Sequence, residues 1–300
     1  MAERLGCAAL SREAGEDPAG TASVVRRWLL IEQPGPWGSD ALTQSRLPSE
    51  LGAQITDAAA AVGARPLLIR RHGRDSGTST APRTVFAAVS TAGTRWIEHF
   101  SVSDPAEVLD LDLSPIAEGR SVGGQRVDDP LFLVCTNGRH DPCCAELGRP
   151  LAATLAAVEP EATWECSHFG GDRFAGNLVC LPHGLYYGRV TPVMAGPITA
   201  AYRAGRMNLA HVRGRSNYPF PVQAAEIALR RAVGNDVIDD LVCESRRDHD
   251  STVQATFRDR VGDRHVVEVD VQRDSPPRVL SCGAAPLPAP RYEIRIVTPR

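Results

Sequence analysis

The chain has 300 residues, of which 43% are hydrophobic, and its formal net charge at pH 7 is −3. This charge gives no electrostatic reason to expect nucleic acid as a partner, and no stretch approaches the roughly 18 consecutive apolar residues that cross a bilayer. The N-terminal residues contain no apolar segment like that of a secretory signal, so we expect a cytoplasmic protein without a membrane partner. In that compartment clustered cysteines indicate metal or redox chemistry before disulfides.

The first part of the chain predicts a unit of strands with one clear helix. A strand is expected at 27–33, and a helix over 48–62, because Pro48 and Ser49 suit a helix start and Gly63 a helix end. Three further strands and a closing segment that suits a short helix are expected at 65–71, 84–90, 95–102 and 104–113.

The same order of elements recurs between residues 131 and 205. A strand, a helix, a strand, a hairpin and a helix are expected at 131–135, 145–158, 163–167, 177–191 and 194–205. A β-α-β-β-(β)-α order is typical of a thioredoxin-like layer, in which helices pack on a mixed sheet. Because the thiols near loops fall in the second unit only, we predict an α/β protein with a scaffold unit at 1–125 and a working unit at 126–212.

Residues 213–300 predict a small α+β module. A Pro-bearing linker is expected at 213–223, followed by an amphipathic helix at 222–234 that ends at Gly234. Strands are expected at 251–259, 264–273, 277–283 and 291–298, with a Pro- and Ala-rich spacer at 283–290.

Two polar segments of the second unit contain the residues that could bind a metal or take part in a reaction. "CTNGRHDPCC" (135–144) follows a buried strand and leads into a helix, where the dipole stabilises a thiolate on Cys144. "CSHFGGDR" (166–173) follows the next strand, and Gly170 and Gly171 allow backbone N–H groups to approach an anionic sulfur. We expect both segments to meet at one edge of the sheet.

The spacing of the thiols bears on what such a site would hold. Zinc sites usually contain a C-x2–4-C pair, which neither segment has. Cys135 and Cys144, with eight residues between them and a histidine loop opposite, suit a larger [2Fe–2S] cluster, in which imidazole can replace thiolate on one iron. Thiol redox chemistry, a zinc ion and the absence of any site remain alternatives at this point.

Other polar and sulfur side chains have ordinary structural explanations beside the functional ones. His140 and Asp141 could hydrogen-bond a cluster or carry protons, and they could equally be polar surface residues of the loop. A positive rim around an anionic cluster could be formed by Arg139, Arg173 and Arg189. The alternative is that these arginines are scattered, solvated side chains. Structural roles are expected for the four cysteines outside the two segments, Cys7, Cys180, Cys243 and Cys282, although a Cys-Gly pair after a strand can present the thiol of the last.

Several motifs together resemble the sucrase/ferredoxin-like family. They are "EDPAGTA", "WLLIEQPGPWG", "CTNGRHDPCCAELGRPL", "CSHFGGDRFAGN" and "YYGRVTP", and the resemblance covers roughly residues 7–215. It implies thioredoxin-like [2Fe–2S] ferredoxin domains. The word "sucrase" in the family name is no evidence for glycoside hydrolysis in this protein. That reaction needs two opposed carboxylates, and no motif of this sequence indicates such a pair.

The resemblance also implies a ligand set. In the family's pattern two cysteines hold one iron and two histidines hold the other, which places ligands on Cys135, Cys144 and His168. The position of the second histidine is occupied by Asp172. The fourth ligand is then Asp172 or Cys166, and Cys143 could exchange with Cys144; Asp172 could instead pair with Arg173 or with an arginine of the other loop. Around the cluster we expect Gly170, Gly171, Arg173 and His140.

These observations predict an electron carrier rather than an enzyme. A [2Fe–2S] protein would pass one electron between a donor reductase and an acceptor, both of them redox partner proteins. One alternative is a thiol–disulfide oxidoreductase that uses Cys143, Cys144 or Cys166, although the chain lacks the usual C-x-x-C at a helix start. The other alternative is a non-catalytic interaction or scaffold protein.

Overall fold

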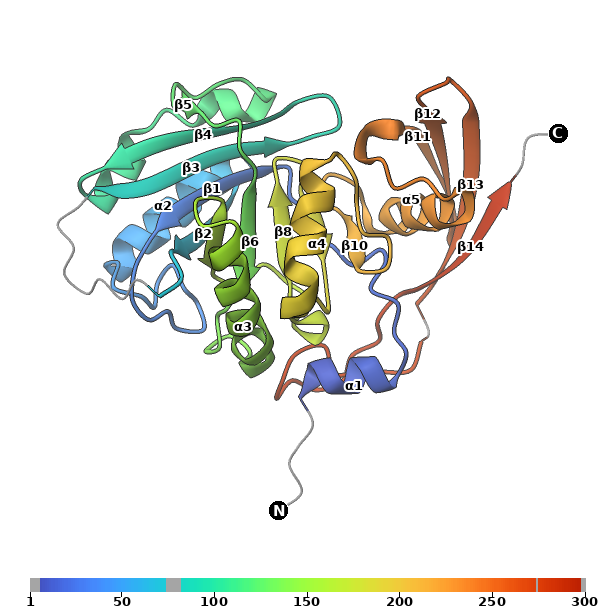
Figure 1. The fold of residues 1–300 in the computed structure, drawn as a ribbon, viewed down its shortest axis with the longest axis horizontal. Coiled ribbons are helices and arrows are strands. Elements are labelled where there is room, and N and C mark those ends of the chain that lie inside the picture. Colours follow the sequence, from blue (N-terminus) through green and yellow to red (C-terminus); the bar gives the residue numbers. More distant parts are fainter. Residues whose placement is uncertain (1–5, 74–81, 274, 298–300) are drawn as a thin grey trace, which may run out of the picture.

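The structure, a computed structural model, describes residues 6–73, 82–273 and 275–297. Ten strands form a mixed sheet through the body of the molecule, and four antiparallel strands form a second sheet at one end (Figure 1). The α/β class predicted from the order of elements is therefore confirmed.

The first half of the large sheet follows the predicted order. β1 (Arg27–Glu32) lies parallel to β2 (Arg65–Arg70) because the helix α2 (Ser49–Ala61) connects them. The next strand, β3, is antiparallel to both β1 and β4. The segment 104–113, for which a short helix is expected, forms the 3-10 helix η1, and a second 3-10 helix, η2, follows it. The remaining elements of this half are β3 (Arg83–Ser90), β4 (Arg95–Val102), η1 (Pro105–Asp110), η2 (Ser114–Glu118) and β5 (Gln125–Arg126).

The second half repeats this topology. β6 (Leu131–Cys135) and β7 (Thr163–Cys166) are parallel and joined by the helix α3 (Pro142–Val158), and β8 is antiparallel to β6 and β9. Within the sheet both halves have the order second, first, third, fourth strand. The remaining elements of this half are η3 (Asp172–Phe174), β8 (Leu178–Leu181), β9 (Leu185–Tyr187), α4 (Pro192–Arg203) and β10 (Val212–Arg215).

Helix α3 begins at Pro142, whereas the hydrophobic pattern predicts a start at residue 145. The Asp141 side chain caps it by accepting the N–H of Cys143 at 2.8 Å, and proline suits the first helical position. Cys143 and Cys144 therefore both lie in the first turn. Successive helical residues point about 100° apart, so their thiols face different parts of the molecule.

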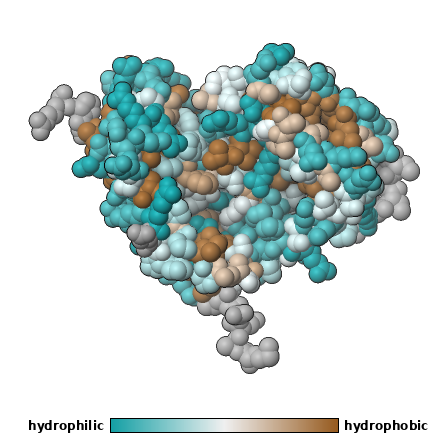
Figure 2. Space-filling view, turned by 180° about the vertical axis from the view of Figure 1, so that it is seen from behind, coloured by the Kyte–Doolittle hydropathy of each residue, from teal (hydrophilic) through white to brown (hydrophobic). Residues whose placement is uncertain are grey.

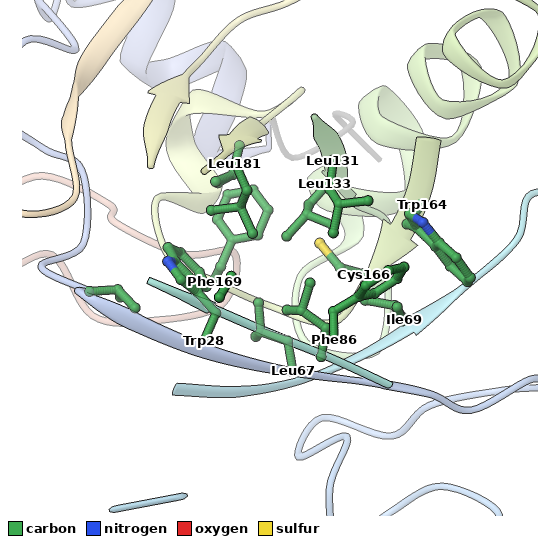
Figure 3. Packing of buried hydrophobic residues seen from close by; sticks show 14 of the residues in the cluster. Trp28, Leu67, Ile69, Phe86, Leu131, Leu133, Trp164, Cys166, Phe169 and Leu181 are labelled. Atoms are coloured by element: carbon green, nitrogen blue, oxygen red, sulfur yellow. The ribbon is translucent and has the colours of Figure 1, made fainter. Parts of the chain in front are cut away.

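The two halves join edge to edge into one sheet. β2 pairs with β7 in antiparallel fashion through Ile69↔Cys166 and Arg70↔Glu165. Side chains of both halves interlock over this seam (Figure 3), with Trp28, Leu67, Ile69 and Phe86 from the first half and Leu131, Leu133, Trp164, Cys166, Phe169 and Leu181 from the second.

A buried ion pair also crosses the seam. Glu165 accepts Arg70 Nη2 at 2.7 Å, its other oxygen lies 2.7 Å from His72 Nδ1, and Thr136 donates at 2.8 Å. Burial opposes ionisation, but Arg70, His72 and Thr136 outweigh it and lower the pKa of Glu165 below its usual value of 4.5. The charged carboxylate thus holds the two halves together.

Glu165→Gln is expected to reduce the free energy of unfolding by about 3–5 kcal/mol at neutral pH, because it leaves Arg70 without its buried counter-charge. Since the folded pKa is depressed, the pair's contribution is complete above the unfolded pKa and is lost as the pH falls through the folded value. Urea unfolding of both proteins from about pH 7 to about pH 3 checks this. A difference that does not shrink toward acid pH would contradict it.

The small sheet lies beyond the large one. The helix α5 (Phe220–Val233) packs on its inner face (Figure 1). Val222, Ala225 and Leu229 of this helix share a buried cluster with side chains of the strands. The short helix η4 (Ile238–Asp240) precedes the four strands, which are β11 (Leu241–His249), β12 (Thr252–Asp259), β13 (Arg264–Gln272) and β14 (Arg291–Val297). Division of the chain at 1–125, 126–212 and 213–300 stays a prediction.

Two expectations for this region are wrong. Residues 213–223 are not a linker: β10 pairs with β9 at the edge of the large sheet, and Arg213 and Arg215 are buried. Gly214 and Pro219 resemble loop signals, but Gly214 sits at a bulge in a paired strand. Residues 277–283 do not form a strand. Only an isolated bridge, Arg278↔Leu287, occurs there.

Residues 275–290, called the crossing segment below, instead leave the small sheet and run beside the helix α1 (Cys7–Glu13) (Figure 1). From behind, hydrophilic residues dominate the surface over the small sheet, and hydrophobic ones gather mainly over the opposite part of the molecule (Figure 2). Among the helices of the described residues, none is both long enough and apolar enough to span a membrane.

Candidate metal centre

The two polar segments do meet at one edge of the sheet, as their positions after neighbouring strands predict. Cys135 ends β6 and is the register partner of Cys166 at the end of β7. Helix α3 crosses close to the end of β6 at Gly148, where a Cβ atom would lie 2.1 Å from the Cys135 carbonyl oxygen. Only glycine permits this approach, which brings Cys144 beside Cys135.

The loop 168–171 is fixed from behind by side chains. Each of its carbonyl oxygens accepts a hydrogen bond. The donors for residues 168, 169, 170 and 171 are, in this order, Arg65 at 3.3 Å, Ser23 at 2.8 Å, Arg213 at 3.0 Å and Asn177 at 2.8 Å. Ser23 and Arg65 belong to the first half of the chain, so that half helps to shape the site.

The turn at Gly170 and Gly171 returns the chain toward His168. Both glycines have positive φ angles, +105° and +89°, which suit glycine, and a Cβ atom on Gly171 would lie 2.1 Å from Arg213 Nη2. As a result Asp172 faces both sulfur and imidazole. Its Oδ1 lies 3.2 Å from Cys144 Sγ and 2.9 Å from His168 Nδ1.

Cys135, Cys144 and His168 form a compact donor group. Their ligand atoms lie within 4.8 Å of one another, and His140, His168 and Asp172 form an overlapping group of the same size. His168 Nδ1 is buried, and despite its closeness to Asp172 it has no partner with hydrogen-bond geometry. Two sulfurs, an imidazole nitrogen and a carboxylate thus converge, and these residues can hold a metal.

Charge is distributed unevenly over this group. The neighbouring Cys144 thiol lowers the pKa of Cys135 to about 5 against the effect of burial, and His168 adds to the shift. The neighbouring Cys135, burial and the Asp172 charge raise the pKa of Cys144. Burial opposes protonation of His168, but Asp172 and Cys135 outweigh it and raise its pKa to about 9. Of the two thiols, Cys135 therefore gives up its proton more readily than Cys144.

His140 forms the outer edge of the site. Its ring stacks on that of His168 with centroids 3.6 Å apart, and its Nε2 lies 3.8 Å from Asp172 Oδ2. The side chains of His140 and His168 are 34% and 20% exposed, whereas Asp172 is 3% exposed. The imidazoles are therefore the part of the group that solvent reaches.

The remaining predicted site residues lie elsewhere. Cys166 is buried in the core of the seam (Figure 3) and is not in either donor group. Cys143 packs with Cys7 on the other side of the first turn of α3. Arg173 pairs with Glu16 at 2.9 Å and not with Asp172.

Two contributing residues are not evident in the sequence. Arg213 lies in a segment that resembles a linker, yet it is fully buried behind the loop 168–171. Ser281 donates to Asp172 Oδ2 at 2.6 Å from the crossing segment, 109 residues further along the chain. No local pattern marks either residue: "VRGR" (212–215) does not alternate hydrophobic and polar residues as a strand would, and Ser281 has no local signal.

Comparison with known proteins identifies the family. No curated protein and no solved structure matches the chain. The family model described as sucrase/ferredoxin-like matches residues 18–214, which include both polar segments and Arg213. The chain therefore belongs to the sucrase/ferredoxin-like family.

Proposed function

We propose that this protein binds a [2Fe–2S] cluster through Cys135, Cys144, His168 and Asp172 and carries single electrons between redox partner proteins in the cytoplasm. The observation that carries this proposal is the position of Asp172, which lies against Cys144 and His168 and completes a set of two sulfur, one nitrogen and one oxygen donor. Cys166, the other candidate for the fourth ligand, lies outside that group.

The proposal includes a thioredoxin-like fold for each half of the large sheet. Its support is the shared order of a parallel pair joined by a helix, followed by an antiparallel hairpin. The second half has ligand residues where its strands end, and the first half supplies hydrogen bonds to the loop 168–171.

When bound, the cluster supplies one-electron oxidation and reduction, and the protein tunes it. Ser281 and the buried surroundings hold the Asp172 carboxylate in one orientation. Arg213 places a buried positive charge behind the site, which favours the more negative, reduced state. The half-exposed stack of His140 on His168 is the place at which a partner protein would come near.

Anaerobic purification with iron and sulfide analysis tests the proposal. We expect a brown protein with about two iron and two sulfide ions per chain and, after reduction, an EPR signal of a [2Fe–2S] cluster. A colourless protein with neither ion would refute it. Reactive thiols in such a protein would favour thiol–disulfide exchange instead.

The fourth ligand is tested in the same preparation. Asp172→His should keep the cluster, raise its reduction potential because neutral imidazole replaces a carboxylate, and change the EPR signal. Cys166→Ala is the matched control and should leave both unchanged. A signal that responds to Cys166→Ala and not to Asp172→His would assign the ligand to Cys166.

A further inference from the structure

A second group of thiols lies on the other side of the first turn of α3. Cys7, Cys143 and Cys282 come together with Asp141, and their four ligand atoms lie within 4.8 Å of one another. From the sequence, Cys7 is expected to have only a structural role. Its neighbours Asp141 and Cys282 are 134 and 275 positions away in the chain, so no local pattern reveals them.

The distances in this group suit a single ion. Cys143 Sγ lies 3.5 Å from Cys282 Sγ, and Cys7 Sγ lies 3.5 Å from Asp141 Oδ2. Donors around a tetrahedral ion with bonds of about 2.3 Å are about 3.8 Å apart, so these two pairs lie within a few tenths of an ångström of that spacing. A disulfide is absent here, because all three cysteines are free.

The backbone around the group is arranged for anionic sulfur. The N–H of Cys7 donates to Cys282 Sγ at 3.3 Å, and N–H···S bonds of this kind orient metal-bound thiolates. Gly6 lies so near that a Cβ atom there would be 2.6 Å from Cys143 Sγ. Three chain segments therefore approach the same point more closely than ordinary apolar packing requires.

Asp141 completes the enclosure. It is fully buried, and its oxygens accept the N–H groups of Cys143 at 2.8 Å and Cys282 at 2.6 Å. Each carboxylate oxygen offers about two lone-pair directions, so Oδ2 retains one for a cation. Cys7 and Cys143 are also buried, and Cys282 is partly so, which gives a closed site.

We propose that Cys7, Cys143, Cys282 and Asp141 form a structural zinc site, separate from the cluster site. Zinc favours thiolate ligands in closed tetrahedral sites, and on binding the three thiols release their protons to solvent. The ion would tie α1 and the crossing segment to the start of α3. Cys7 and Cys282 lie outside the residues that match the family, so the site would belong to the terminal segments of this chain.

Metal analysis of the full chain tests the proposal independently of the cluster. We expect about one zinc ion per chain in protein from zinc-supplemented cells, falling below about 0.1 in Cys7→Ser and Cys282→Ser with iron unchanged. Cys144→Ala should lose iron and keep zinc. The matched control Cys243→Ser, at a partly exposed cysteine of the small sheet, should keep both.

Cobalt titration supplies a readout that does not depend on the serine variants folding. Cys144→Ala protein is first stripped of metal by a chelator and then titrated with Co²⁺. We expect thiolate-to-cobalt charge-transfer bands and tetrahedral d–d bands that stop growing at about one cobalt ion per chain. Added zinc should abolish both sets of bands. Zinc-free wild-type protein, zinc retained by Cys282→Ser, iron bound at these cysteines, or an octahedral cobalt spectrum would each overturn the proposal. Zinc in a protein without iron would uphold it while refuting the electron-carrier function.

Discussion

Cys144→Ala should abolish binding of the proposed iron–sulfur cluster, while Cys143→Ala should leave that binding in place. Cys144 Sγ lies 3.2 Å from Asp172 Oδ1 on the cluster side of α3, and Cys143 Sγ lies 3.5 Å from Cys282 Sγ on the other side. Because thiolate is the preferred donor to iron–sulfur clusters, the loss of Cys144 should reduce iron and sulfide from about two per chain to nearly none.

The two variants form a matched comparison, because the two positions are adjacent and buried and each substitution removes one sulfur atom. Iron, sulfide and zinc are measured in the same samples, with circular dichroism to show that each variant is folded. Retention of iron by Cys144→Ala would remove Cys144 from the ligand set. Loss of iron from Cys143→Ala alone would mean that the neighbouring cysteines exchange roles.

Arg213→Met should both destabilise the protein and lower the reduction potential of the cluster. The guanidinium is fully buried, and burial lowers its pKa to about 10, so it stays charged at neutral pH. It donates to the Gly170 carbonyl, to Asn177 Oδ1 and to the Thr21 carbonyl at 3.0, 2.8 and 2.6 Å. Each acceptor left unpaired costs about 1–3 kcal/mol, so we expect a loss of several kcal/mol.

Arg213→Lys separates the two effects. Lysine keeps the positive charge but cannot reproduce the planar fork of donors, so the potential should stay near that of the wild type while stability falls. Arg139→Met removes an exposed charge from the other loop and serves as the control, with little change expected in either quantity. Potentiometry and urea unfolding measure the two effects. A potential that Arg213→Met does not change would show that this charge does not act on the cluster.

The parts of the fold that short patterns specify could be predicted from the sequence. Strands such as 27–33 and 131–135 are continuous hydrophobic runs between turn residues, and the connection by one helix makes their partners parallel. The meeting of Cys135, Cys144 and His168 follows from the same logic, because they lie at the end of β6, in the first turn of α3 and just after β7. Polar strands are harder: β11 carries "ESRRDH" on a mostly exposed edge and has no hydrophobic alternation.

The parts of the site that depend on distant segments could not be predicted. Arg213, Ser281 and Cys7 each contact the polar segments from far along the chain, and no periodicity records such contacts. Their positions depend on β10 being the edge strand of the large sheet and on the path of α1 and the crossing segment. For Cys282 the sequence shows only that the thiol is followed by a glycine. Its neighbours Cys7, Asp141 and Cys143 can be identified only from the folded chain.

The crossing segment also determines how this protein can be shortened. β14 follows it and covers β13, so a chain that ended near residue 272 would expose the edge of a strand rich in valine, which is prone to pair with other molecules. Such a chain would lose Ser281 from Asp172 as well. The last residues of the chain therefore do two things: they cover the edge of β13, and they help to orient Asp172 in the part that matches the family.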